Sequence, residues 1–119
     1  MTKTLLLVED DEDLLESTQT MLENEGLDIS IAKNGDEAIQ KYKLHSPCLV
    51  FMDLMMPKKD GYEAFNEIKQ NDPSAKVIFV SGVIQDQEKL SHAQEIGLLN
   101  FLHKPVSLQN YKDMISKYD

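Results

Sequence analysis

The sequence predicts a single α/β domain in which an open sheet of parallel strands is covered by helices on both faces. Along the chain, the pattern of apolar residues alternates between the continuous runs typical of strands and the spacing of roughly 3.6 residues typical of helices. The connections between these segments are short, and the 119 residues contain no internal repeat and no linker-like stretch. Because parallel neighbours need crossover connections, a strict alternation of strands and helices favours a parallel sheet with helices on both faces.

In the first half of the chain, three predicted strands alternate with two predicted helices. Leu5–Val8 is a short continuous apolar run, which is typical of a strand buried on both faces. The helix that follows has an apolar face made of Leu14, Leu15, Thr18, Met21 and Leu22. Asp28–Ala32 alternates apolar and polar residues, as expected of an edge strand. The face of the second helix consists of Ala38, Ile39 and Tyr42. The apolar run Leu49–Met52 is the third strand.

The second half continues the alternation with three helices and two strands. The helix after the third strand buries Phe65, Ile68 and the stem of Lys69. Val77–Val80 is another wholly apolar strand, whereas "LLNFLH" carries Asn100 and His103 and is predicted to be a second edge strand. The faces of the last two helices consist of Leu90, Ala93 and Ile96, and of Leu108, Tyr111, Ile115 and Tyr118. Stop signals directly after four helices are Gly26, Pro47, Pro73 and Gly97.

The composition excludes several classes of partner and location. The formal charge is −9 and every basic residue is a lysine, so the chain repels phosphate backbones and lacks the guanidinium group most used to bind guanine. Direct nucleic-acid binding and attachment to an anionic membrane are therefore not expected. The single cysteine, Cys48, cannot form an internal disulfide, and no apolar run approaches membrane-spanning length. We expect a cytoplasmic protein.

Polar side chains follow four of the five predicted strands. The acidic stretch "EDDED" begins at Glu9, after the first strand; Asp53, Ser81 and Lys104 follow the third, fourth and fifth strands. In open parallel sheets, ligands bind beyond the carboxyl ends of the strands. Clustered carboxylates repel one another, and oxygen ligands suit a hard divalent cation. The sequence therefore predicts a cation site that can hold a phosphoryl group.

Four motifs, in this order, resemble the receiver domain of two-component response regulators. They are "LLLVED" with Glu9 and Asp10, "FMDLMMPKKDG" with Asp53, "FVSG" with Ser81, and "FLHKP" with Phe101 and Lys104. The resemblance covers the whole chain, residues 1–119, as one receiver domain. It implies a flavodoxin-like (CheY-like) three-layer α/β/α fold with five parallel strands in the order 2-1-3-4-5 and five helices.

The resemblance also implies a role for each motif residue. Asp53 is the expected phosphoacceptor. The phosphoryl group is expected to come from a phosphohistidine on a sensor histidine kinase or a histidine phosphotransfer protein. The expected Mg²⁺ ligands are Asp10, Asp53, the backbone carbonyl of Met55 and, through water, Glu9. Lys104 is expected to pair with Asp53 and with the phosphoryl group. Ser81 and Phe101 are the expected switch pair, and Leu90–Tyr118 is the expected contact face for a downstream protein. The implied domain is a signalling switch, which catalyses only its own phosphorylation and dephosphorylation.

Of three other classes of protein, two do not fit the residues of this site. A haloacid-dehalogenase-type phosphatase needs a second acid two residues after its nucleophile, where this chain has Met55. A flavodoxin-type electron carrier needs a phosphate-binding loop after the first strand, where "EDDED" would repel the flavin phosphate. A pseudo-receiver, a binding module of the same fold that is never phosphorylated, remains the alternative.

Three further expectations concern the loops around the site. The Lys104–Pro105 peptide bond is predicted to be cis, because the fifth strand must end abruptly and direct Lys104 toward Asp53. Lys58 and Lys59 are expected to be solvated loop residues. Met55 and Val83 are apolar where many relatives carry polar groups near the phosphoryl group, which predicts a long-lived phosphorylated state.

Overall fold

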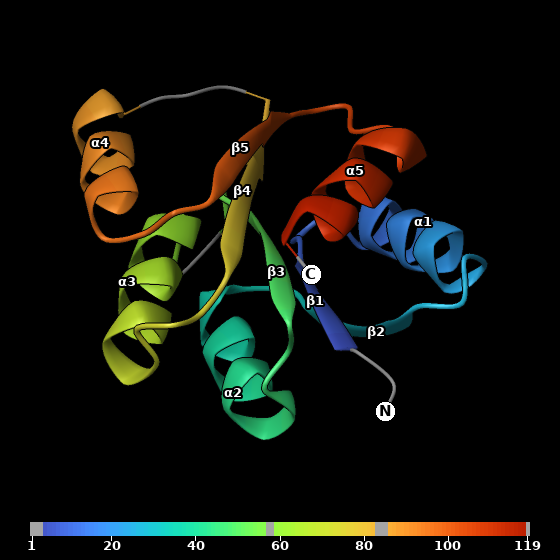
Figure 1. Cartoon of the computed structure of the whole chain (residues 1–119), viewed down its shortest axis with the longest axis horizontal. Coiled ribbons are helices and arrows are strands. Elements are labelled where there is room, and N and C mark those ends of the chain that lie inside the picture. The colour runs from blue at the N-terminus through green and yellow to red at the C-terminus, as the bar shows by residue number, and fades with distance from the viewer. Residues whose placement is uncertain (1–3, 57–58, 83–85, 119) are drawn as a thin grey trace.

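The computed structural model describes residues 4–56, 59–82 and 86–118, which form five parallel strands alternating with five helices (Figure 1). The strands are β1 (Thr4–Val8), β2 (Asp28–Ala32), β3 (Leu49–Asp53), β4 (Val77–Ser81) and β5 (Asn100–His103). The helices are α1 (Glu12–Glu23), α2 (Gly35–His45), α3 (Gly61–Asn71), α4 (Gln87–Glu95) and α5 (Leu108–Tyr118). The predicted order of elements is confirmed.

The strands lie in the order β2-β1-β3-β4-β5, as the resemblance implied. The central strands β3 and β4 are buried along their whole length, whereas the edge strands β2 and β5 are partly exposed, as predicted from their polar residues. In the register of the sheet, Asp53 lies opposite Val80 and Ser81 lies opposite His103. The carboxyl ends of β3, β4 and β5 therefore meet at one edge of the sheet.

Two apolar layers flank the sheet. Helices α1 and α5 pack on one face, and α2, α3 and α4 pack on the other (Figure 1). An edge contact between the rings of Phe51 and Tyr111, with centroids 4.9 Å apart, joins β3 to α5. The rings of Phe65 and Phe79, 5.2 Å apart, join α3 to β4 on the opposite face. The fold therefore has the predicted α/β/α layers.

Helices α1 to α4 each begin at an Asp or Asn cap, and at the start of α5 the backbone N–H of Asn110 donates to the hydroxyl of Ser107. The capping residues are Asp11, Asn34, Asp60 and Asp86, each of which accepts a hydrogen bond from a backbone N–H in the first turn. Such caps satisfy N–H groups that have no partner inside the helix, and the three aspartates also place negative charge at the positive end of the helix dipole. Asp11 therefore has a structural role, although it stands next to the acidic pair Glu9 and Asp10.

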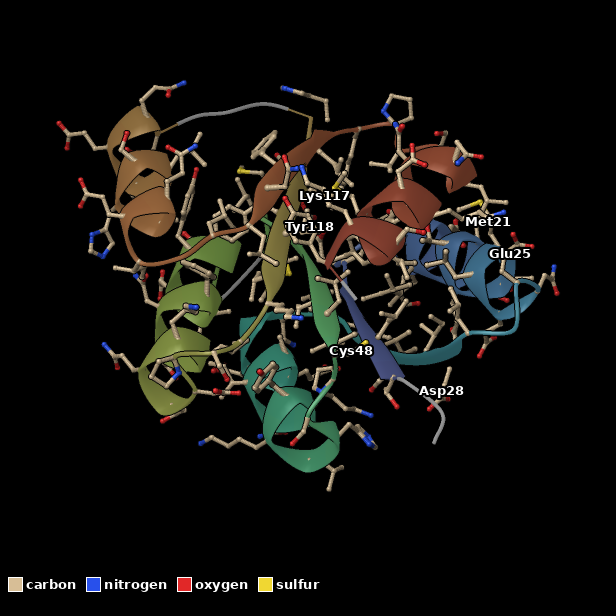
Figure 2. The ribbon with its side chains drawn as sticks, in the orientation of Figure 1. Met21, Glu25, Asp28, Cys48, Lys117 and Tyr118 are labelled. Atoms are coloured by element: carbon tan, nitrogen blue, oxygen red, sulfur yellow. The ribbon has the colours of Figure 1, made fainter. Side chains whose placement is uncertain are left out.

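The far end of α5 is fastened to the sheet by Tyr118, which lies in the last turn of the helix (Figure 2). Its hydroxyl donates to the carbonyl of Leu99 over 3.1 Å, and the amide of Asn100 donates to the hydroxyl over 3.3 Å. Asn100, one of the two polar residues that predicted β5 to be an edge strand, thus holds α5 against the sheet.

None of the helices in the described ranges is long and apolar enough to cross a membrane.

The helix faces were predicted correctly with one exception. Leu15 and Leu22 of α1 are buried, but Leu14 is 41% exposed, so this member of the predicted apolar face is not covered. Leu14 borders a cavity between α1 and α5 instead of reaching the sheet. The spacing of apolar residues identifies a helix face, but the width of the stripe that is covered depends on the neighbouring helix.

Candidate functional site

An acidic cluster lies at the carboxyl ends of β1 and β3. Glu9 directly follows β1, Asp10 follows Glu9, and Asp53 is the last residue of β3. One carboxylate oxygen from each residue lies within 4.8 Å of the others. Asp53 is 4% exposed and Glu9 is 8% exposed, whereas Asp10 is exposed. The three residues come together because β1 and β3 are parallel neighbours whose ends meet.

Lys104 brings a positive charge to this cluster from the end of β5. Its Nζ lies 3.4 Å from Asp53 Oδ2, the predicted pair, and 2.5 Å from Glu9 Oε1. The shorter contact, with Glu9, was not predicted from the sequence. The backbone N–H of Lys104 donates to the carbonyl of Ser81 over 3.0 Å. The Lys104–Pro105 bond is cis, which confirms that prediction.

Burial and neighbouring charge shift the ionisation of each group. Burial, followed by hydrogen bonding and repulsion from Glu9, raises the pKa of Asp53 to about 7. Burial acts in the same direction on Glu9, but hydrogen bonds with Asp53 and Lys104 outweigh it and lower the pKa of Glu9. Burial acts to lower the pKa of Lys104, but the carboxylates of Glu9 and Asp53 outweigh it and raise that pKa. The cluster therefore holds more negative charge than Lys104 balances.

The donor set fits a hard divalent cation. Three carboxylates at one edge of the sheet supply oxygen ligands, which a hard divalent cation prefers, and the exposed side of Asp10 leaves room for bound water. A cation would also relieve the repulsion that disfavours the charge of Asp53. Glu9, Asp10 and Asp53 are therefore the residues that could hold the metal.

The predicted switch residues lie on the strands beside the cluster. Ser81, the last residue of β4, is 1% exposed. Phe101 of β5 is partly buried, packs against the core cluster on the side of α2, α3 and α4, and makes an edge contact with the ring of His103 at 5.0 Å. Phe101 pairs with Phe79, two residues before Ser81, so the β4–β5 ladder joins the strands that carry the two predicted switch residues.

The loop after Asp53 brings its own residues to the site. The backbone N–H of Met55 approaches Asp53 Oδ1 at 3.4 Å, and its side chain is 51% exposed. Gly61, at the start of α3, donates to the carbonyl of Leu54 over 3.1 Å. A Cβ atom on Gly61 would lie 2.3 Å from the carbonyl oxygen of Asp53. The sequence contains this glycine in its "DG" pair, but the spacing did not reveal the close approach.

Lys59 is not the solvated loop residue that was predicted. Its side chain is 21% exposed, its Nζ lies 3.3 Å from Asp36 Oδ1, and it forms an ion pair with Glu67. Both acids belong to helices, α2 and α3 respectively, and no local sequence signal links them to the loop. Lys58, for which the same prediction was made, and Val83 lie outside the described residues.

A cavity of about 290 Å³ opens beside the cluster, between α1 and α5. Its walls are mostly apolar and include Leu14, Val106 and Tyr111, while Glu9, Asp53 and Lys104 border it. Burial, followed by the charge of Glu9, raises the pKa of the buried residue Tyr111 to about 12. An apolar group could therefore be accommodated next to Asp53.

Comparisons with known proteins agree on one family. The family model described as response regulator receiver domain matches residues 5–116. The chemotaxis protein CheY of Halobacterium salinarum is 38% identical over 116 residues, which cover 98% of this chain and 96% of that protein.

Solved structures show the same fold. A CheY-like receiver domain protein from Methanospirillum hungatei has a TM-score of 0.91 at 27% identity, covering 98% of this chain and 93% of the other. The chain in a CheX–CheY–BeF3–Mg complex from Borrelia burgdorferi has a TM-score of 0.86 at 26% identity, covering 97% and 87%.

Proposed function

Because this chain belongs to the response regulator receiver domain family of two-component signalling proteins, we propose that Asp53 accepts a phosphoryl group from a partner protein. The donor is a phosphohistidine on a sensor histidine kinase or a histidine phosphotransfer protein. The observation that carries this proposal is the nearly buried carboxylate of Asp53, held between Glu9, Asp10 and Lys104.

The transfer forms one bond and breaks one. A carboxylate oxygen of Asp53 attacks the phosphorus, the P–N bond to the donor imidazole breaks, and the imidazole keeps the electron pair. The attack brings negative charges together, so positioning and charge neutralisation dominate the catalysis of such steps. Lys104, already 3.4 Å from Asp53, supplies one positive charge to the phosphoryl oxygens. The chain thus catalyses only its own phosphorylation and, with water as the attacking group, its own dephosphorylation.

Mg²⁺ is the proposed cofactor, and it supplies further neutralisation of the phosphoryl charge when it is bound. Asp10, Asp53 and the backbone carbonyl of Met55 are the proposed direct ligands, and Glu9 acts through a water molecule. The close grouping of the three carboxylates supports this assignment. The Borrelia relative, whose complex contains Mg²⁺, supports it by similarity.

Asp10 and Asp11 are neighbours with different expected contributions to metal binding. We expect Asp10→Ala to weaken Mg²⁺ binding at least tenfold, as loss of one charged ligand does. Asp11→Ala removes a helix cap and about 1 kcal/mol of stability, but it should leave the dissociation constant within about twofold because Asp11 accepts from Asp13 and Leu14 of α1. Calorimetric titration of both variants with Mg²⁺ measures the difference. Equal losses would remove Asp10 from the ligand set.

Phosphorylation is proposed to act as a switch through Ser81 and Phe101. The hydroxyl of Ser81 bonds the phosphoryl group, and Phe101 repacks as Ser81 moves. The phosphoryl group can shift the equilibrium between an inactive and an active conformation only if it interacts more favourably with one of them. Ser81 and Phe101 must therefore differ in position between the two conformations. The β4–β5 ladder, which joins the strands that carry Ser81 and Phe101, supports this coupling. The surface that changes is Leu90–Tyr118, which we propose as the contact face for the downstream protein.

The phosphorylated state is predicted to decay slowly, because Met55 and Val83 cannot orient an attacking water. We expect Met55→Asn and Val83→Glu each to raise the decay rate several-fold. The half-exposed side chain of Met55 leaves a polar replacement in reach of solvent. The decay of labelled protein after removal of the donor gives the rate. If neither variant accelerates it, another part of the site controls access of water.

Labelling tests the proposal as a whole. The purified chain is incubated with a small acyl phosphate or a phosphorylated histidine kinase, with and without Mg²⁺, and covalent phosphate is counted. One phosphoryl group per chain, only with Mg²⁺, is the expected result. A chain that takes no label from either donor would be the pseudo-receiver binding module instead.

A further inference from the structure

We propose that Lys59 is a positioning residue, which holds the start of α3 against the carboxyl end of β3 and so fixes Asp53 for metal binding and phosphorylation. This inference rests on the proposed function of Asp53. Lys59 lies outside the carboxylate cluster, and its expected role from the sequence was solvation of a loop.

The side chain of Lys59 links two helices. Its Nζ forms an ion pair with Glu67, in the second turn of α3, and lies 3.3 Å from Asp36 Oδ1, in the first turn of α2. The side chain of Lys59 is 21% exposed, whereas those of Asp36 and Glu67 are 60% and 46% exposed, so it is the presence of two partners, and not burial of the pairs, that holds the ammonium in place. An ammonium group held by two acids from different helices restricts the position of the residue that carries it.

The backbone of Lys59 is held as well. Gly35, the first residue of α2, donates its N–H to the carbonyl of Lys59 over 3.2 Å. A Cβ atom on Gly35 would lie 2.6 Å from that carbonyl oxygen and 2.7 Å from Cγ of Lys59. Glycine at this position therefore permits a backbone approach that a larger residue would prevent.

The residues that follow Lys59 transmit its position to Asp53. Asp60 caps α3 by accepting from Glu63, and Gly61 donates to the carbonyl of Leu54. The place where Gly61 would carry a Cβ lies 2.3 Å from the carbonyl oxygen of Asp53, so the start of α3 is packed directly on the Asp53 peptide group. A shift of Lys59 and its two successors moves the backbone that carries the phosphoacceptor carboxylate.

The test measures the dissociation constant of Mg²⁺ by calorimetry, together with thermal unfolding. Lys59→Met keeps the apolar stem and removes the ammonium. We expect it to weaken Mg²⁺ binding about fivefold, the equivalent of roughly 1 kcal/mol. Lys59→Arg is expected to restore binding to within about twofold of the original chain. Gly35→Ala, which changes no charge, is expected to weaken binding by a similar factor because its methyl group displaces the Lys59 carbonyl.

Lys112→Met is the matched control. Lys112 forms a 2.9 Å ion pair with Glu25, which lies beyond the end of α1 that is remote from the acidic cluster (Figure 2). Loss of a lysine makes the chain more negative, so electrostatics alone would strengthen Mg²⁺ binding in both lysine variants. Weaker Mg²⁺ binding in Lys59→Met, but not in Lys112→Met, is therefore the result that a positional role of Lys59 predicts.

The outcomes separate the two proposals. Unchanged or tighter Mg²⁺ binding by Lys59→Met overturns the role of Lys59 and leaves the function of Asp53 intact, provided that the original chain still binds Mg²⁺ and takes phosphate. Failure of Lys59→Arg to restore binding also overturns it, because an ion-pair anchor accepts either cation. An original chain that binds no Mg²⁺ and takes no label would overturn both proposals.

Discussion

The Asp53→Asn variant is expected to take no phosphoryl label from an acyl phosphate or from a phosphorylated histidine kinase. An amide lacks the anionic oxygen that attacks phosphorus. The other buried carboxylate of the cluster, Glu9, is already held by the shorter contact with Lys104. The substitution removes one of three crowded negative charges, so it should not lower the temperature of unfolding. Loss of label can then be attributed to chemistry.

Asp113→Asn provides the control for the loss of a carboxylate. Asp113 lies on α5, where its side chain accepts from Gln109 at the surface. We expect this variant to be labelled at the original rate and to the original extent. Label in Asp53→Asn equal to that of Asp113→Asn would show that another residue is the phosphoacceptor.

The Gly61→Ala variant is expected to lose both stability and labelling. The added methyl group would lie 2.3 Å from the carbonyl oxygen of Asp53 and 2.8 Å from Cα of Leu54. These atoms belong to the backbone of a buried strand end, so neither can rotate away. We expect the free energy of unfolding to fall by about 1–3 kcal/mol, as overpacking does. Displacement of Asp53 should slow labelling about 100-fold. Denaturant unfolding and a labelling time course measure the two effects.

Gly26→Ala separates the loss of stability from the displacement of the site. Gly26 has a φ of +84°, so alanine there costs about 1–2 kcal/mol, but nothing lies within 4 Å of its Cβ position. Gly26 follows the end of α1 that is remote from the acidic cluster. Its alanine variant should therefore be less stable and yet label at the original rate. Equal labelling of the two glycine variants would mean that Gly61 does not position Asp53.

The amino-acid sequence by itself determined the order of strands and helices along the chain and which residues make up the site. Runs such as Leu49–Met52 identify buried strands because the pattern of apolar residues is a local property. The position of Asp53 directly after such a run then places it at the carboxyl edge of a parallel sheet. The same reasoning placed Glu9, Ser81 and Lys104 at that edge. The resemblance to a known family supplied the strand order, which the structure confirms.

The tertiary structure decided which groups at that edge touch and which surfaces are covered. The 2.5 Å contact between Lys104 and Glu9 joins residues 95 positions apart. The ion pairs of Lys59 and the exposure of Leu14 likewise depend on where α2, α3 and α5 pack. Periodicity specifies which face of an element is apolar, but it does not specify the distance and rotation between two packed elements. Contacts between side chains of different elements depend on those two quantities, so they emerge only when the whole chain is folded.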